Sequence, residues 1–111
     1  MLKFKLKDYL SENGHSPFNE WLTGLRDLQA RARVRTRLDR VRIGNLGDYV
    51  SVGDGVFELR IFYGPGYRVY FGQDGDRLVI LLCGGDKKTQ RKDIDTAKAY
   101  WQDYQQRKTS S

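Results

Sequence analysis

The chain has 111 residues, with 20 Lys and Arg against 14 Asp and Glu, which gives a formal net charge of +6 at pH 7. This charge predicts an acidic partner without identifying it. The length fits one compact domain, residues 1–111, and leaves little room for a second core. Because 39% of the residues are hydrophobic, the chain can form a packed core, which argues against intrinsic disorder.

Membrane and secretory classes find no support in the sequence. The longest apolar stretch, Leu78 to Cys83, is far shorter than the roughly 20 residues of a membrane helix. The N-terminus interleaves lysines with apolar residues and lacks the apolar region of a secretory signal. Cys83 is the single cysteine, so no internal disulfide can form. We therefore expect a soluble cytoplasmic protein with no membrane partner.

The first third of the chain is predicted to form an edge strand and a short helix. Apolar residues and lysines alternate over residues 3–7, as in a half-buried strand near a sheet edge. Ser16 and Pro17 fit the N-cap and first position of a helix. Its apolar face would consist of Phe18, Trp21, Leu22 and Leu25.

The segment from Arg26 to Arg42 is predicted to be a second helix, and it holds most of the net charge. Seven arginines and two aspartates give it a charge of +5. Val34, Leu38 and Val41 recur at helical spacing and form an apolar stripe. The arginines beside this stripe either form a solvated face, with their stems over the core edge, or bind nucleic acid or an acidic protein. They are Arg31, Arg33, Arg35, Arg37, Arg40 and Arg42.

A short strand is predicted over residues 48–52, and the hairpin that follows it is the clearest pattern in the second half of the chain. Apolar residues alternate over residues 56–63 and 67–71, and Gly64-Pro65-Gly66 lies between these two runs. If Tyr63 pairs with Tyr67, Arg60 and Arg68 lie on the face opposite the main apolar set. They are then diagonal neighbours, close enough to hold one anion.

The chain is predicted to end with a central strand and a long helix. Residues 78–83 are apolar on both faces, which favours a central strand, and Gly84-Gly85 would end it. A helix follows from about Lys88 to Gln106, with a frayed tail over residues 107–111. The predicted fold class is therefore α+β: a strand, two helices packed on one sheet face, a three- or four-stranded antiparallel meander and a C-terminal helix.

Several kinds of chemistry are excluded by residue type. His15 is the single histidine, so Cys and His cannot assemble a zinc site, and a Cys-His or Ser-His nucleophile is disfavoured. The segment that begins Gly84-Gly85 lacks the spacing of a phosphate-binding loop for nucleoside triphosphates. We expect no metal and no cofactor.

Four cations remain as candidates for binding a phosphate: Arg60, Arg68, Lys87 and Lys88. The two lysines stand where the last strand meets the last helix, and N–H groups at a helix N-terminus favour an anion. Cleavage of an RNA phosphodiester without metal needs such positioned cations, because negative charge grows on the phosphoryl oxygens. The alternative is a set of ordinary surface charges and ion pairs, with Glu58 as the partner of Arg60.

Three motifs in this region, taken together, indicate a family. They are LRI at residues 59–61, GPGYRVYF at residues 64–71 and GGDKKTQ at residues 84–90. Their combination resembles the HigB-like "addiction module killer protein" (phage-derived Gp49-like) branch of the RelE/ParE toxin superfamily. The order of elements in the N-terminal half agrees, so the resemblance covers nearly the whole chain.

The resemblance implies a toxin of a type II toxin–antitoxin pair. RelE-like members cut messenger RNA in the ribosome without metal, through attack of the 2′-hydroxyl on the adjacent phosphate. A helix-turn-helix (HigA-like) antitoxin would neutralise the toxin, and operator DNA would be bound only through the antitoxin. The arginines of the second helix would then bind RNA or the antitoxin.

The resemblance also assigns residues. Arg68 matches the arginine that contacts the scissile phosphate, Arg60 a cationic position in the preceding strand, and Lys87 a basic residue after the last strand. Glu58 stands where RelE has a lysine, and the tyrosine and histidines used by relatives are missing. Proton transfer is therefore open among Glu58, Lys87, Lys88 and Asp93.

Two other functions stay open at this point. A ParE-like inhibitor of DNA gyrase belongs to the same superfamily and needs no catalytic residues. A non-catalytic RNA-binding module is also compatible, because the order of elements resembles a domain that binds double-stranded RNA.

Overall fold

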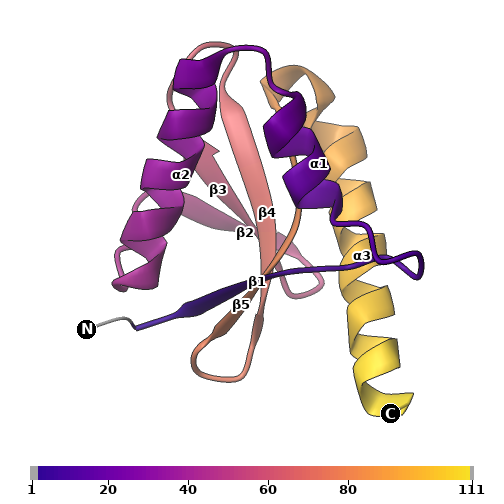
Figure 1. Cartoon of the computed structure of the whole chain (residues 1–111). Coiled ribbons are helices and arrows are strands. Elements are labelled where there is room, and N and C mark those ends of the chain that lie inside the picture. The colour runs from indigo at the N-terminus through magenta and orange to yellow at the C-terminus, as the bar shows by residue number, and fades with distance from the viewer. Residues whose placement is uncertain (1–2, 111) are drawn as a thin grey trace.

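One five-stranded sheet, in the order β1-β5-β4-β3-β2, forms the centre of the protein. A computed structural model describes residues 3–110. The elements, shown in Figure 1, are β1 (Lys5–Asp8), α1 (Pro17–Gly24), α2 (Leu28–Arg42), β2 (Tyr49–Gly53), β3 (Val56–Ile61), β4 (Tyr67–Asp74), β5 (Leu78–Asp86), the 3-10 helix η1 (Lys87–Thr89) and α3 (Gln90–Ser110). The predicted α+β class and order of elements are confirmed.

The sheet is antiparallel except at one edge. Strands β2 to β5 form the predicted meander, but β1 pairs with β5 in parallel, with Lys5 opposite Leu78. The expectation of an antiparallel sheet is therefore wrong for β1. Residues 9–77, 69 in all, separate these two strands, so the connection between them is long enough for a parallel pair. The lysines of β1 do lie at a sheet edge, as predicted.

Helices cover both faces of the sheet. Helices α1 and α2 pack on one face, where their buried residues meet those of β3, β4 and β5 in a core that includes Phe18, Val34, Leu38, Leu59, Val69 and Leu81. Helix α3 covers the other face, in a core that includes Val56, Tyr70, Ile80, Leu82, Ala97 and Trp101. The prediction that both N-terminal helices pack on one face is confirmed.

Local signals set the starts of the first two helices. The Ser16 hydroxyl accepts a hydrogen bond from the Asn19 N–H at 3.0 Å, and Pro17 begins α1. The Asp27 carboxylate caps α2 by accepting from the Gln29 N–H at 2.9 Å. The predicted stripe of α2 is buried against the sheet, which leaves the arginines at its flanks.

The hairpin of β3 and β4 has a different register from the predicted one. Ile61 pairs with Tyr67, and Arg60 lies directly opposite Arg68 rather than diagonal to it. Strand β3 ends early because Tyr63 turns away: its hydroxyl donates to the Asp27 carboxylate at 2.8 Å and its carbonyl accepts from the Gly66 N–H at 3.1 Å. The two arginines are therefore closer neighbours than expected, on the face that was predicted.

Strand β5 does not end at Gly84-Gly85. Both glycines continue the strand, with Gly84 opposite Val69 and Gly85 opposite Arg68. They are needed for close packing, because a Cβ on Gly84 would lie 2.2 Å from the Trp21 ring and one on Gly85 would lie 1.8 Å from the Asp93 carboxylate. The strand thus reaches Asp86, directly before Lys87.

Helix α3 extends past Gln106, where the sequence analysis placed its end. Residues as far as Ser110 are helical, and two side chains of the expected tail form ion pairs, Arg107 with Asp103 at 2.7 Å and Lys108 with Asp74. Ser111, the last residue of that tail, lies outside the described residues. Among residues 3–110, no helix has the length and apolar character that crossing a membrane requires.

The contact of Trp21 with Gly84 predicts the effect of adding one methyl group to β5. Gly84→Ala should lower the free energy of unfolding by about 2 kcal/mol, because the new Cβ overlaps the indole ring. Urea denaturation followed by circular dichroism measures this change. Gly24→Ala is the matched control, since a Cβ there meets no atom within 4 Å. Equal unfolding midpoints for the two variants would contradict the packing described here.

Candidate functional site

A cavity of about 430 Å³ lies at the end of the β3–β4 hairpin, beside the start of η1. Its lining includes Arg60, Arg68 and Lys87, the three cations that the sequence analysis singled out. Arg60 and Arg68 occupy paired positions of β3 and β4, and Lys87 follows β5 directly. The three side chains therefore come together because three neighbouring strands place them at the same end of the sheet.

A buried carboxylate, Glu58, holds the two arginines. Its side chain is fully buried and forms ion pairs with Arg60 Nε at 3.0 Å and with Arg68 Nε at 3.6 Å. The Tyr70 hydroxyl and the Gln90 amide also donate to it, at 3.0 Å and 2.8 Å. Glu58 thus receives hydrogen bonds or ion pairs from four side chains. Its expected pairing with Arg60 is confirmed, but Glu58 is buried and is not an ordinary surface charge.

Glu58 remains ionised in this setting. Burial by itself would raise the pKa of Glu58, but hydrogen bonds from Gln90, Arg60 and Tyr70, with the charge of Arg68, outweigh it and lower the pKa below its ordinary value of 4.5. Burial and the nearby Glu58 charge raise the pKa of Tyr70, which stays a neutral donor. A carboxylate with a lowered pKa and no exposed surface is a weak general base. These properties favour a positioning role for Glu58.

Arg68 is the more enclosed of the two arginines. Its side chain is 13% exposed, against 37% for Arg60, and its Nη1 donates to the Gly66 carbonyl at 2.9 Å. The buried Nε of Arg68 has no hydrogen-bond partner among the residues that the structure describes. The Arg68 guanidinium is therefore fixed in orientation at the cavity wall and is only partly satisfied by the protein.

Two N–H groups at the N-terminus of η1 are already bonded within the protein, which argues against the expected phosphate site there. The Asp86 carboxylate caps this helix and accepts from the N–H groups of Lys88 and Thr89, at 2.9 Å and 3.2 Å. An acidic side chain thus already occupies these donors. Lys87 contributes to the cavity through its side chain instead.

Three of the four proposed proton-transfer residues, Glu58, Lys88 and Asp93, are not part of the cavity lining. Lys88 lines a separate surface hollow with residues of the first turns of α3. Asp93 accepts a hydrogen bond from the Thr89 hydroxyl and packs against Gly85. The cavity lining therefore brings Lys87 together with Arg60 and Arg68 but includes neither Lys88 nor Asp93, although the Asp93 carboxylate lies against Gly85, the residue paired with Arg68.

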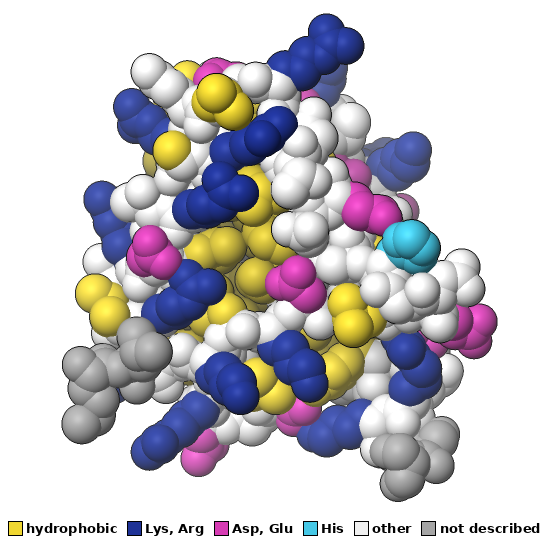
Figure 2. Space-filling view, viewed as in Figure 1, with side chains coloured by type: hydrophobic (Ala, Val, Ile, Leu, Met, Phe, Trp, Pro, Cys, Tyr) yellow, Lys and Arg dark blue, Asp and Glu magenta, His cyan; other side chains and the backbone are white. Residues whose placement is uncertain are grey.

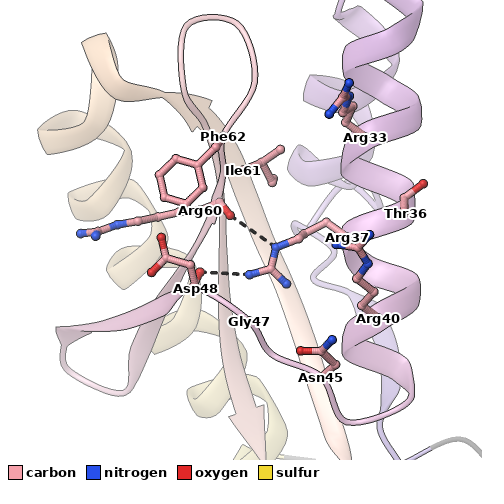
Figure 3. A pocket seen from close by; sticks show the side chains of 10 residues that line it. All are labelled: Arg33, Thr36, Arg37, Arg40, Asn45, Gly47, Asp48, Arg60, Ile61 and Phe62. Atoms are coloured by element: carbon pink, nitrogen blue, oxygen red, sulfur yellow. Dashed lines mark hydrogen bonds between the residues drawn. The ribbon is translucent and has the colours of Figure 1, made fainter.

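A second cavity, of about 510 Å³, lies between α2 and the end of β3 (Figure 3). Arg33, Arg37 and Arg40 line it from α2. Arg37 is held within the protein, since its Nε donates to the Arg60 carbonyl at 3.4 Å and its Nη2 to the Asp48 carbonyl at 3.1 Å. Burial, and then the charge of Arg40, lower the pKa of Arg37. Arg37 therefore links α2 to β3 and to the residue before β2.

The other arginines of α2 differ in how they are held. Arg31 donates to the Leu25 carbonyl at 2.7 Å, and Arg42 pairs with Asp39 at 2.6 Å. The Arg33 guanidinium lies over the Tyr63 ring, 4.8 Å from its centre. Arg35 and Arg40 are exposed, and their guanidinium groups make no hydrogen bond or ion pair within residues 3–110. Figure 2 shows the face of the molecule that carries α1 and α2. Basic side chains are spread over its α2 side, and apolar side chains lie between α2 and α1.

Three side chains near the cavities were not singled out from the sequence. Gln90 is the last residue of the GGDKKTQ motif, so the motif contained a signal that was not assigned a role. Tyr70 lies two residues after Arg68 on the same strand face, and strand alternation alone could have placed it beside Glu58. Phe62 lines both cavities, but its position depends on where β3 ends, which the sequence did not determine.

Comparison with known proteins identifies a matching family. The profile of the family described as phage derived protein Gp49-like (DUF891) matches residues 20–102, a range that holds α2 and every residue lining the cavity beside η1. An uncharacterized protein of Haemophilus influenzae (strain KW20 / Rd) is 56% identical over 81 residues, which cover 73% of this chain and 82% of that protein. The match agrees with the Gp49-like part of the resemblance, while the RelE/ParE and HigB-like assignment stays a prediction.

The Glu58 network predicts a loss of stability in a near-isosteric variant. Glu58→Gln should lower the free energy of unfolding at pH 7 by about 3 kcal/mol, because two guanidinium groups then face a neutral amide. The lowered pKa means that the contribution of Glu58 is fully present above pH 4.5 and is lost as the pH falls through its folded-state pKa. The difference between variant and wild type should therefore narrow below pH 4.5 in urea titrations.

The control for this titration is Glu20→Gln, which changes an exposed carboxylate of α1. This variant should stay within about 0.5 kcal/mol of the wild type at pH 7. A Glu58→Gln variant as stable as Glu20→Gln at every pH would show that the buried carboxylate does not hold the two arginines in solution.

Proposed function

The chain belongs to the Gp49-like family of phage-derived proteins, which is related to toxin–antitoxin systems, and we propose that it is a toxin that cleaves messenger RNA on the ribosome. The observation that carries this proposal is the convergence of Arg60, Arg68 and Lys87 on one cavity. A phosphate placed there would meet three cations from three different segments. The site of action is the cytoplasm, where ribosomes translate the message.

The chemistry that fits this cavity is attack by an RNA 2′-hydroxyl on the adjacent phosphorus. The 2′-oxygen forms a bond to phosphorus while the bond from phosphorus to the 5′-oxygen breaks, which gives a cyclic phosphate and a 5′-hydroxyl. The 2′-hydroxyl loses its proton to solvent water, and the leaving 5′-oxygen gains one, so that protons balance over the step. Negative charge grows on the phosphoryl oxygens during this step, and Arg60 and Arg68 would stabilise it.

The candidate residues then have different roles. Arg68, enclosed and fixed by Glu58 and the Gly66 carbonyl, would bind the scissile phosphate. Glu58 would act as a positioning residue that keeps both guanidinium groups at the cavity wall. Among the proton-transfer candidates, Lys87 lines the cavity, and its ammonium would donate to the leaving oxygen.

The family relation to toxin–antitoxin systems implies an antitoxin partner. We infer that this partner is a helix-turn-helix (HigA-like) protein, that it brings acidic segments to the basic surfaces of this chain, and that operator DNA is bound only through it. Co-expression of a helix-turn-helix antitoxin of this kind would then restore growth to cells that express this chain.

The assignment of Arg68 predicts a large loss of activity on truncation. Arg68→Ala should lower the rate of transcript cleavage on purified translating ribosomes by about 100-fold or more, because one group that stabilises transition-state charge is lost. It should also relieve growth arrest. Arg77→Ala, which truncates an exposed arginine at the β4–β5 turn, is the control and should cleave at the wild-type rate.

Equal cleavage by Arg68→Ala and wild type would contradict the assigned site. Supercoiling assays with purified gyrase test the alternative function, inhibition of DNA gyrase. Inhibition of gyrase, with no cleavage of messenger RNA by the wild type, would replace the proposed function by a ParE-like one.

Two neighbouring lysines give a matched pair for testing the cavity. Lys87 lines it and Lys88 points into a different hollow, although both are exposed and adjacent in the chain. Lys87→Ala should therefore lower the rate of cleavage by about 10-fold or more, and Lys88→Ala should leave it unchanged. Single-turnover cleavage by the two purified variants is the measurement. The reverse order of effects would place the reacting phosphate outside this cavity.

A further inference from the structure

Phe62 is the most exposed large apolar side chain among the described residues, at 80%. It follows β3 directly and begins the connection to β4. Burial of a Phe side chain stabilises a fold, so exposing one forgoes that gain. A solvent-exposed aromatic ring at the edge of a cationic cavity is therefore suited to bind a ligand that has a flat apolar surface.

Phe62 lies where the two cationic cavities meet. Arg60, Ile61 and Phe62 line both of them, so the cavities adjoin at the end of β3. Arg68 and Lys87 line one cavity beyond this point, and arginines of α2 line the other. In Figure 3 the Phe62 ring and the Arg60 side chain extend to the same side, away from α2. The order along this surface is thus cation, aromatic ring, cation.

The chain holds Phe62 in this position through the next residue. Tyr63 stacks on Tyr67, with ring centres 6.5 Å apart, and its hydroxyl donates to the Asp27 carboxylate at 2.8 Å. The Arg33 guanidinium covers the other part of the Tyr63 ring at 4.8 Å. These contacts anchor the connection from both the strand and α2. Little further ordering of the backbone is then needed when a ligand binds to Phe62.

We propose that Phe62 is a stacking platform for one base of single-stranded RNA, whose backbone passes from the α2 cavity to the Arg68 and Lys87 cavity. This inference rests on the proposed RNA substrate. Single strands offer phosphates and accessible base faces in alternation, and proteins bind them with cationic grooves and aromatic side chains. An acidic peptide would satisfy the arginines without using the ring. Duplex RNA keeps its bases stacked on each other, so Phe62 would have no free base to contact.

The test uses a single-stranded RNA decamer that is 2′-O-methylated throughout, so that it cannot be cleaved, and that contains one 2-aminopurine. Phe62→Ala should bind this probe about 10-fold more weakly than wild type, because base–aromatic stacking is lost. Its salt dependence should be unchanged, since no charge is removed. Arg40→Ala, by contrast, should lower the slope of log affinity against log salt by about 1.

Two further variants separate stacking from general effects. Phe62→Tyr keeps an aromatic ring and should keep wild-type affinity and the quenching of 2-aminopurine fluorescence. Ile43→Ala truncates another exposed apolar side chain, at 58% exposure and outside both cavities, and should bind as wild type does. Circular dichroism of each variant checks that the fold is retained.

The inference is overturned if Phe62→Ala binds the probe like Ile43→Ala, or if the wild type shows no salt-dependent binding to it. It is also overturned if Phe62→Ala weakens binding of the antitoxin alone, which would make this surface a protein interface. The experiments can also separate this inference from the proposed function. Binding through Phe62 without transcript cleavage would uphold the stacking platform and refute the nuclease. Transcript cleavage at the same rate by Phe62→Ala and wild type would uphold the nuclease and refute the stacking platform.

Discussion

The candidate site depends on one buried carboxylate. Removing Glu58 from water is costly, and the cost is offset only because two guanidinium groups, a tyrosine hydroxyl and an amide surround it. These partners come from β3, β4 and α3, so the same carboxylate links three elements of the fold. It also holds the side chains of Arg60 and Arg68, which the strand register places directly opposite each other across the hairpin. Structure and candidate chemistry therefore depend on the same set of contacts.

The charge of the chain is divided between two regions with different properties. Helix α2 holds most of the net charge, yet three of its arginines are bonded within the protein and act partly as structural groups. The cavity beside η1 contains fewer cations, and the negative charge of Glu58 offsets part of theirs. Net charge thus indicated the basic helix and gave little sign of the smaller cavity. What distinguishes that cavity is the fixed orientation of its guanidinium groups, since preorganised charge is what phosphoryl chemistry requires.

Much of the fold could be predicted because its local patterns are strong. The Ser16-Pro17 start of α1, the buried stripe of α2 and the alternation of β3 and β4 each depend on neighbours within a few residues. The register of the hairpin could not be predicted, because it depends on Tyr63 leaving the strand to reach Asp27, which lies 36 positions away in the chain. The close packing of Gly84 against Trp21 and of Gly85 against Asp93, which accompanies the continuation of β5, likewise could not be seen from the sequence.

The same distinction applies to the site. Arg60, Arg68 and Lys87 could be selected from motifs, and strand alternation put the two arginines on one face. The role of Glu58 could not be derived, because a carboxylate beside an arginine in sequence is equally compatible with an exposed ion pair. The burial of Glu58, its contact with Gln90 and its lowered pKa became visible only with the three-dimensional arrangement.

The central claim is that Glu58 acts through the arginines it holds, and a double-mutant cycle on the rate of transcript cleavage tests it most directly. The four proteins are wild type, Glu58→Gln, Arg68→Ala and the double variant, each measured on translating ribosomes. The account predicts strong coupling: Glu58→Gln slows the wild type by about 10-fold or more and has little further effect once Arg68 is truncated. Independent effects, with the two losses multiplying in the double variant, would contradict it.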